Sequence, residues 1–167
     1  IELSSLVTTF LMPKLVTNSS PAIVVMGVSG CGKTSLAAAI AAALDCPMLE
    51  GDVFHAESSQ AKMASGIPLT DADRAGWLKE LGKQLAAHES GVVLSCSALK
   101  KNYRDTLRSY KVDLRFVYLD ISPATALARV ASRTTAGSHF FPATLVDNQF
   151  TTLEVPTGEV GVLTVDA

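Results

Sequence analysis

The sequence of 167 residues has few cysteines, little net charge and no long hydrophobic run, and each shortage excludes a class of protein. Cys31, Cys46 and Cys96 are odd in number and lack metal-ligand spacing, which argues against a disulfide framework and for a reducing compartment, the cytoplasm. A net charge of -2 gives no electrostatic reason to expect a nucleic-acid partner. No apolar run approaches the roughly 18 residues of a membrane span, so we expect no membrane partner.

The first 20 residues differ from the rest of the chain. Residues 1–11 are largely apolar but have neither a basic region nor a small-residue cleavage site, so they make a poor signal peptide. Because Met12 stands close before the first apolar strand, we expect residues 1–20 to be an N-terminal extension, either disordered or added upstream of the natural start. A targeting remnant is the alternative. Residues 21–167, rich enough in hydrophobic side chains for a layered core, would form a single domain.

A glycine-rich loop is the most informative motif. Residues 27–34 fit G-x-x-x-x-G-K-[ST] and stand between an apolar strand and a helical stretch, which is the order that a phosphate-binding P-loop requires. Lys33 would reach the β- and γ-phosphates, and Thr34 would ligate Mg²⁺. The motif therefore predicts a nucleoside triphosphate, held by Gly27, Val28, Ser29, Gly30, Cys31, Gly32, Lys33, Thr34 and Ser35.

Apolar strands alternate with helical patterns along the chain, which predicts βαβ units around a parallel sheet with helices on both faces. The expected strands are residues 23–26, 48–49, 92–94, 114–119 and 160–165. Thr70, with Asp73 three residues on, is expected to cap a helix, and Ser122-Pro123 to start another. The helix at residues 33–44 is apolar almost all round, so we expect it to be buried. The polar stretch at residues 134–138 suggests a small lid near residues 129–141.

Polar residues after the second strand are candidates for the phosphate acceptor site. Asp52 is expected at the carboxyl edge of the sheet, where open α/β folds bind ligands. It could position an acceptor hydroxyl, take its proton or support Mg²⁺; a solvated loop carboxylate is the alternative. His55 could hydrogen-bond a polyol, or could be a structural residue beside Phe54.

Two sets of cations have helical spacing. Lys100, Arg104 and Arg108 would place three positive charges on one helix face, for an anionic acceptor or simply for solvent. Arg129 and Arg133 stand just before the expected lid. Two guanidinium groups that swing onto a transferring phosphoryl group would supply the charge stabilisation on which that reaction mainly depends.

Several motifs resemble those of the small P-loop gluconokinases. They are residues 26–34, Gly51-Asp52-x-x-His55, Lys62-Met63-x-x-Gly66 with residues 68–78, residues 96–108, and His139-Phe140-Phe141. The resemblance implies ATP-dependent phosphorylation of D-gluconate to 6-phospho-D-gluconate. It also implies a three-layer α/β/α fold with a five-stranded parallel sheet in the order 2-3-1-4-5. Gly76 departs from the pattern, because the family commonly has proline before the tryptophan.

The resemblance also implies roles for individual residues. Lys33, Asp52, Arg129 and Arg133 would be catalytic, with Thr34 and Asp52 at the metal. The carboxylate and hydroxyls of gluconate would be met by Asp52, His55, Lys62, Arg74, Lys100, Arg104 and His139. Lys62 could instead lie on the surface.

Other readings stay open at this point. A kinase for another small acid or sugar, such as shikimate, would share the P-loop and the lid arginines. The family runs on into a final helix, so a truncated ATP-binding copy without activity is another alternative. A switch GTPase is disfavoured because no N/T-K-x-D guanine motif occurs. Small kinases of this kind are often dimers, which makes a homodimer possible.

Overall fold

The computed structural model describes residues 21–135 and 142–167. The predicted N-terminal extension, His139 and the last part of the predicted lid, residues 136–141, lie outside the described residues.

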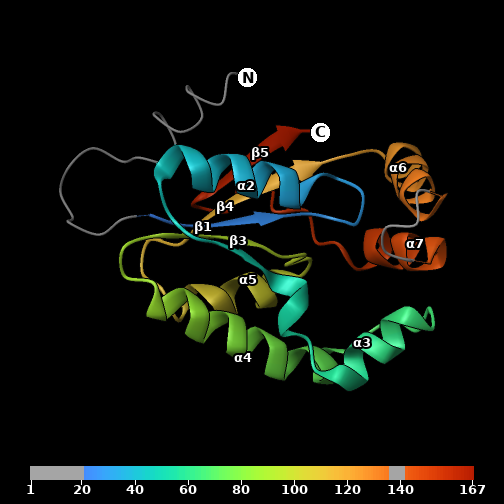
Figure 1. The fold of residues 1–167 in the computed structure, drawn as a ribbon, viewed down its shortest axis with the longest axis horizontal. Coiled ribbons are helices and arrows are strands. Elements are labelled where there is room, and N and C mark those ends of the chain that lie inside the picture. The colour runs from blue at the N-terminus through green and yellow to red at the C-terminus, as the bar shows by residue number, and fades with distance from the viewer. Residues whose placement is uncertain (1–20, 136–141) are drawn as a thin grey trace.

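A single five-stranded parallel sheet forms the centre of the described part of the chain (Figure 1). Its order is β2-β3-β1-β4-β5, which confirms the predicted order. The register pairs Val24 with Leu94 on one side of the central strand and with Phe116 on the other. The strands are β1 Ala22–Met26, β2 Met48–Glu50, β3 Val92–Ser95, β4 Arg115–Asp120 and β5 Val162–Asp166.

Helices cover both faces of the sheet, as predicted, and each face has its own hydrophobic core. Ile23 and Val25 of β1 belong to the core under α2, α6 and α7, whereas Val24 and Met26 belong to the core over α4 and α5. The alternation follows from the pleat, which directs successive side chains to opposite faces. The helices are α2 Lys33–Leu44, the 3₁₀-helix η2 Gly51–Phe54, α3 Glu57–Ala64, α4 Asp71–Ala87, α5 Lys101–Arg108, α6 Pro123–Thr135 and α7 Ala143–Thr152.

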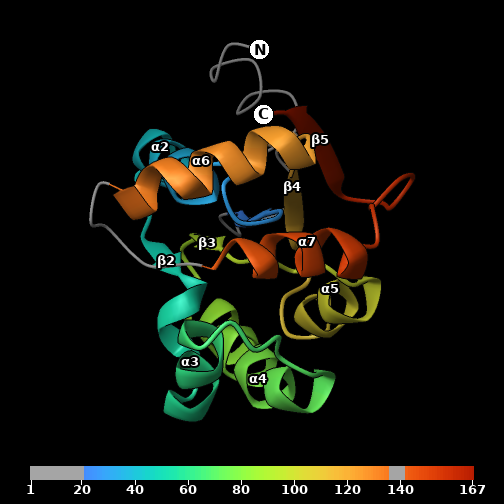
Figure 2. The same cartoon turned by 90° about the vertical axis from the view of Figure 1, so that its right-hand side faces the viewer.

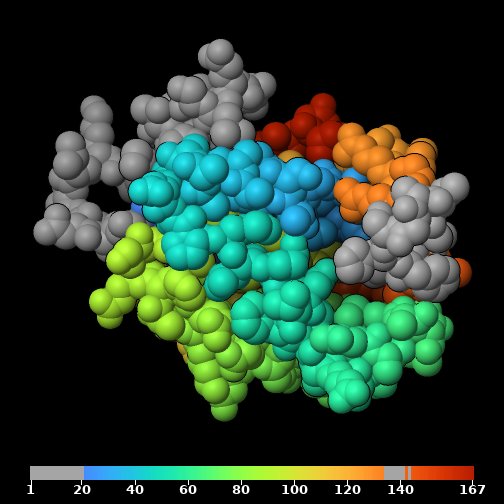
Figure 3. Space-filling model, in the orientation of Figure 1, coloured from blue at the N-terminus to red at the C-terminus, as the bar shows by residue number. Residues whose placement is uncertain are grey.

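The arrangement leaves the carboxyl ends of the strands facing α6 and α7. Figure 2 looks onto this edge and shows the two helices in front of the sheet, with the loop after β1 between them. The space-filling view shows α2 above, α4 below and α3 at one end of the molecule (Figure 3). Within the two described segments, no helix is long and apolar enough to cross a lipid bilayer.

Local helix signals were read correctly from the sequence. Thr70 accepts a hydrogen bond from the Asp73 amide, and the Asp73 carboxylate accepts one from the Thr70 amide, which is a complete capping box. Ser122 Oγ accepts from the Thr125 amide at the start of α6.

Two expectations were wrong, one about the burial of α2 and one about where the last strand begins. In α2 only Ala37, Ile40 and Ala41 are buried, because much of the apolar composition comes from alanines that face solvent. The last strand begins at Val162 rather than residue 160, and Val160 is 93% exposed. Gly161, with φ 75°, turns the chain immediately before the strand.

Candidate active site

The loop after β1 has the backbone conformation of a phosphate cradle. Gly27, Gly30 and Gly32 all have positive φ, at 145°, 87° and 98°. A Cβ on Gly30 would lie 2.7 Å from the Ala126 carbonyl oxygen of α6, so a side chain there has no room. α2 begins at Lys33 without a side-chain cap, which leaves its first amides for an anionic ligand at the positive end of the helix.

The two polar side chains that follow the cradle have protein partners. Lys33 Nζ donates to the Val28 carbonyl at 3.0 Å, across its own loop. Thr34 Oγ1 donates to Glu50 Oε2 at 2.8 Å. Glu50 was missed by the sequence reading, although its position at the end of β2, two residues before Asp52, could have indicated it.

The donor set beside Thr34 suits magnesium. A hydroxyl and a carboxylate are hard oxygen ligands of the kind that Mg²⁺ prefers. Residues 21–135 and 142–167 contain no cluster of three or more His, Cys, Asp or Glu side chains that could hold a metal alone. The residues present therefore fit an ion that takes most of its ligands from phosphate and water.

A small cavity of about 40 Å³ lies beside the P-loop and brings together five of the predicted residues, Ser29, Lys33, Asp52, His55 and Arg74. They come from the loop after β1, α2, η2, the residue after η2, and α4, which meet at the carboxyl edge of the sheet. The rest of the lining was not predicted: Met63, Pro68, Leu69, Ser97, Leu145, Asn148 and Gln149.

Helix α7 supplies Leu145, Asn148 and Gln149 to the wall of the small cavity. Gln149 Oε1 accepts a hydrogen bond from the Ser29 amide at 2.6 Å, which ties α7 to the P-loop. Gln149 is 120 residues from Ser29, so no local pattern in the sequence could indicate this contact.

His55 and Arg74 are the buried polar groups of the small cavity, at 6% and 8% exposure. His55 Nδ1 and Arg74 Nε have no hydrogen-bond partner among the described residues. Desolvation lowers the pKa of His55 to about 4, with Arg74 adding to the effect and Asp52 opposing it. The imidazole is therefore neutral near pH 7. Buried polar atoms without partners are rare in native proteins and mark a place where a ligand can supply them.

Lys62 and Lys100 do not line the small cavity. Lys62 Nζ lies 2.7 Å from an oxygen of Asp73, and Lys100 Nζ lies 2.8 Å from an oxygen of Asp71. The hydrogen bond from Lys62 is the main cause that lowers the pKa of Asp73 to about 2. Both lysines thus neutralise the acidic first turn of α4.

Arg104 is a structural residue, which corrects its predicted contact with the substrate. Its side chain is fully buried, and its five donors are all used. Nη1 donates to the carbonyls of Ala98 and Leu99, Nη2 to the carbonyl of Glu154 and to Glu159, and Nε to Glu159. No N–H group is left for a carboxylate or hydroxyl of a substrate.

The predicted arginines before the lid belong to α6, which runs along the P-loop. Arg129 Nη1 makes a long hydrogen bond of 3.5 Å to the Gly30 carbonyl. Arg133 lies one turn further, in the last turn of α6. Arg129 therefore lies beside the phosphate cradle, on the side of α6 whose Ala126 backbone lies next to Gly30.

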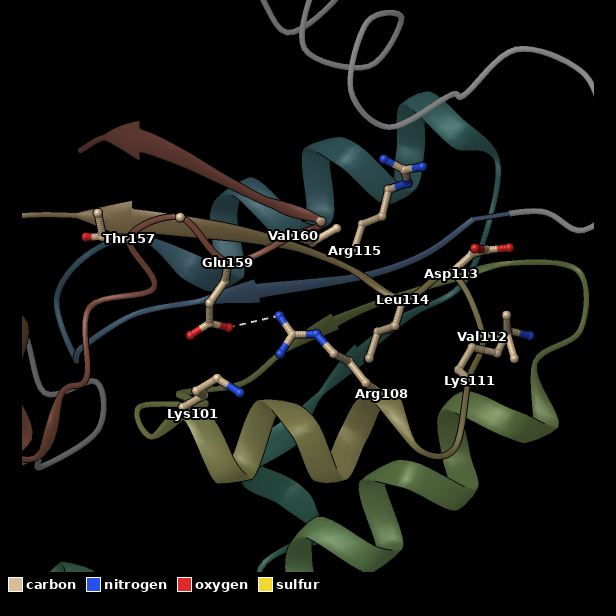
Figure 4. A pocket seen from close by; sticks show the side chains of 12 residues that line it. Lys101, Arg108, Lys111, Val112, Asp113, Leu114, Arg115, Thr157, Glu159 and Val160 are labelled. Carbon is tan, nitrogen blue, oxygen red and sulfur yellow. Dashed lines mark hydrogen bonds and ion pairs between the residues drawn. The ribbon is translucent and has the colours of Figure 1, made fainter.

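A larger cavity of about 860 Å³ lies at the other end of the sheet, before the strands β4 and β5 (Figure 4). Arg108 and Glu159 form an ion pair across it at 2.9 Å. Of the predicted candidates only Arg108 lines it, and its charge is balanced by Glu159 and Asp105. The small cavity, not this one, adjoins the phosphate loop.

Known proteins are similar to this chain in sequence and in fold. A family model described as an AAA domain matches residues 23–156. A gluconokinase of Gluconobacter oxydans (strain 621H) is 44% identical over 147 residues, covering 86% of this chain and 80% of the relative. The thermosensitive gluconokinase of Escherichia coli (strain K12) is 39% identical, covering 81% and 73%. The crystal structure of a gluconokinase from Sinorhizobium meliloti 1021 superposes with a TM-score of 0.80 at 48% identity, covering 87% of this chain and 82% of that one.

Proposed function

Because this chain belongs to the gluconokinase family, we propose that it transfers the γ-phosphoryl group of ATP to the terminal hydroxyl of D-gluconate, giving 6-phospho-D-gluconate. The observation that carries the proposal is the small cavity, in which the P-loop lysine meets an acidic residue, a histidine and a buried arginine. These groups match an acceptor with one carboxylate and several hydroxyls.

The phosphate end of the site binds the nucleotide. Residues Gly27 to Ser35 offer backbone amides and the Lys33 ammonium to the phosphates. Thr34 is the side chain that would hold Mg²⁺, with Glu50 orienting the hydroxyl or a bound water. When bound, Mg²⁺ neutralises charge on the β- and γ-phosphate oxygens. Arg129 and Arg133 stabilise the charge that develops on the transferring group, from the α6 side.

The acceptor end binds gluconate. Arg74 takes the carboxylate, because a guanidinium with a free buried donor is the strongest anion partner in the small cavity. Asp52, at the rim, orients the terminal hydroxyl and accepts its proton as the phosphoryl group transfers. A cavity of about 40 Å³ is smaller than a six-carbon acid, so its walls on α3 and α7 separate as the substrate enters.

The test is ADP release with Mg-ATP and a panel of D-gluconate, shikimate, glucose, glycerate and nucleoside monophosphates. We expect turnover on D-gluconate, and loss of about 100-fold or more in kcat for Asp52→Ala, because the acceptor hydroxyl loses its base. Glu89→Ala, an exposed carboxylate away from the cavity, is the matched control and should behave as wild type.

Turnover on shikimate or another panel member in place of gluconate would replace the proposed substrate. Silence across the panel from folded protein that binds ATP would favour a copy without kinase activity. Full activity of Asp52→Ala on gluconate would remove Asp52 from the mechanism.

A further inference from the structure

Trp77 connects the two elements that supply the acceptor end of the small cavity. Its indole Nε1 donates to the Gly51 carbonyl at 2.8 Å in a buried hydrogen bond. Its ring stacks on the His55 ring, with centroids 4.3 Å apart and an interplanar angle of 10°. Trp77 lies one turn after Arg74 on α4, and Gly51 directly precedes Asp52. One side chain therefore fixes the turn that carries Asp52 and His55 against the helix that carries Arg74.

The stack is what orients the His55 ring. The backbone of His55 is held by other groups, since its amide donates to the Asp52 carbonyl and its own carbonyl accepts from Gln60 Nε2. Its ring Nδ1 has no partner among the described residues. Without the indole face, nothing in these contacts would fix the plane of the imidazole.

The chemistry of an uncharged imidazole decides what it can recognise. One ring nitrogen donates a hydrogen bond and the other accepts one, which complements an alcohol, itself both donor and acceptor. A carboxylate is better served by Arg74. The two buried side chains thus divide the substrate between them, one taking the carboxylate and the other a hydroxyl.

We propose that Trp77 is a positioning residue that holds the His55 ring against a hydroxyl of the acceptor, and so strengthens the binding of polyhydroxylated carboxylic acids. This rests on the proposed function, because it concerns the same acceptor site. Trp77 itself is 3% exposed and does not line the small cavity, so it acts through His55 and not by touching the substrate.

The test compares Trp77→Leu and Trp77→Phe with Leu85→Ala, a core variant on the same helix and away from the cavity. In Trp77→Leu we expect the KM for D-gluconate to rise about tenfold, with the KM for ATP within about twofold of wild type. Trp77→Phe keeps an aromatic face, so its KM for D-gluconate should lie between those of wild type and Trp77→Leu. Leu85→Ala should lose stability without changing the KM for gluconate. His55→Asn combined with Trp77→Phe should have nearly the same KM as His55→Asn alone, because the two residues act as one unit.

A second readout does not depend on turnover. The pKa of His55, followed by NMR of the imidazole, should rise from about 4 toward 6.5 in Trp77→Leu, because the ring loses the stacked face that desolvates it. It should rise less in Trp77→Phe and stay low in Leu85→Ala. An unchanged KM and His55 pKa in the folded Trp77 variants would overturn the positioning role, as would additive effects of the two residues. If wild-type protein does not phosphorylate gluconate at all, the proposed function fails on that separate ground.

Discussion

Side chains at the phosphate end of the site have protein partners that a nucleotide would replace. Lys33 donates to the Val28 carbonyl and Thr34 to Glu50, so each is held near its proposed place. The exchange favours the ligand, because a charge-assisted bond between lysine and phosphate is stronger than one between lysine and a neutral carbonyl.

Glu50 gives the sharpest prediction for a single residue. Changing Glu50 to Gln keeps the shape of the side chain but removes the negative charge beside Thr34. We expect the Mg²⁺ concentration for half-maximal activity to rise about tenfold, as for other groups that orient a metal ligand. The KM for gluconate should stay as in wild type. Titrating Mg²⁺ at saturating ATP and gluconate measures the effect.

Glu57→Gln, an exposed carboxylate in the first turn of α3, is the control for that titration. An Mg²⁺ requirement that is the same in both variants would mean that Glu50 is only a structural partner of Thr34.

At the scale of the element, α4 shows two glycines with opposite surroundings. Gly76 has nothing within 4 Å of an added Cβ, whereas a Cβ on Gly82 would lie 2.3 Å from the Tyr110 ring. Gly76→Ala should raise the free energy of unfolding by about 1 kcal/mol, because alanine is the better helix former. Gly82→Ala gains the same propensity but must displace the ring, so we expect it to be destabilising. Urea unfolding of the two variants, each the control of the other, measures the difference; equal stabilisation would contradict the packing of Tyr110 on α4.

The same helix shows what a sequence can indicate about an element. The capping box at Thr70 follows from local spacing and was predicted. The buried face that includes Trp77 and Leu81 has the same local spacing. In α2 the same reasoning failed, since alanine is apolar but small enough to face water at little cost. For α2, composition therefore predicted the helix correctly and its burial wrongly.

At the scale of the whole molecule, Glu159 joins the segment before β5 to the buried face of α5. The Arg104 and Arg108 guanidinium groups, with Arg104 the larger influence, lower the pKa of Glu159 below its usual 4.5. A lowered pKa adds stability that is fully present above pH 4.5 and is lost as the pH falls through the folded value. We expect Glu159→Gln to cost about 3 kcal/mol at pH 7, because it leaves Arg104 charged and fully buried. The variant should also lose less stability than wild type on acidification.

Denaturant unfolding at pH 7 and at a series of acidic pH values measures both effects. Asp105→Asn is the matched control, because Asp105 pairs with Arg108 at the exposed surface and such pairs contribute about 1 kcal/mol or less. A loss for Glu159→Gln no greater than that for Asp105→Asn would contradict the role of the buried pair.

The candidate site was predictable where one strand end or one loop defines it. The P-loop, Asp52 and His55 follow directly after β1 and β2, and parallel strands bring their carboxyl ends to one edge. Arg74 came from the family resemblance and lines the same cavity. Arg104 was misjudged because its partner Glu159 is 55 residues away, and helical spacing says nothing about partners so distant.

That separation has a consequence for synthesis on the ribosome. Arg104 leaves the exit tunnel 55 residues before Glu159, so a nascent chain that stops between them holds an arginine without its anion. Burying that cation without its anion is costly, so we expect that α5 does not pack stably on the sheet before Glu159 is available. We expect the packing of α5 on the sheet to be completed last, when the segment before β5 leaves the ribosome. The position of Glu159 late in the chain would thus delay this step of folding until translation is almost complete.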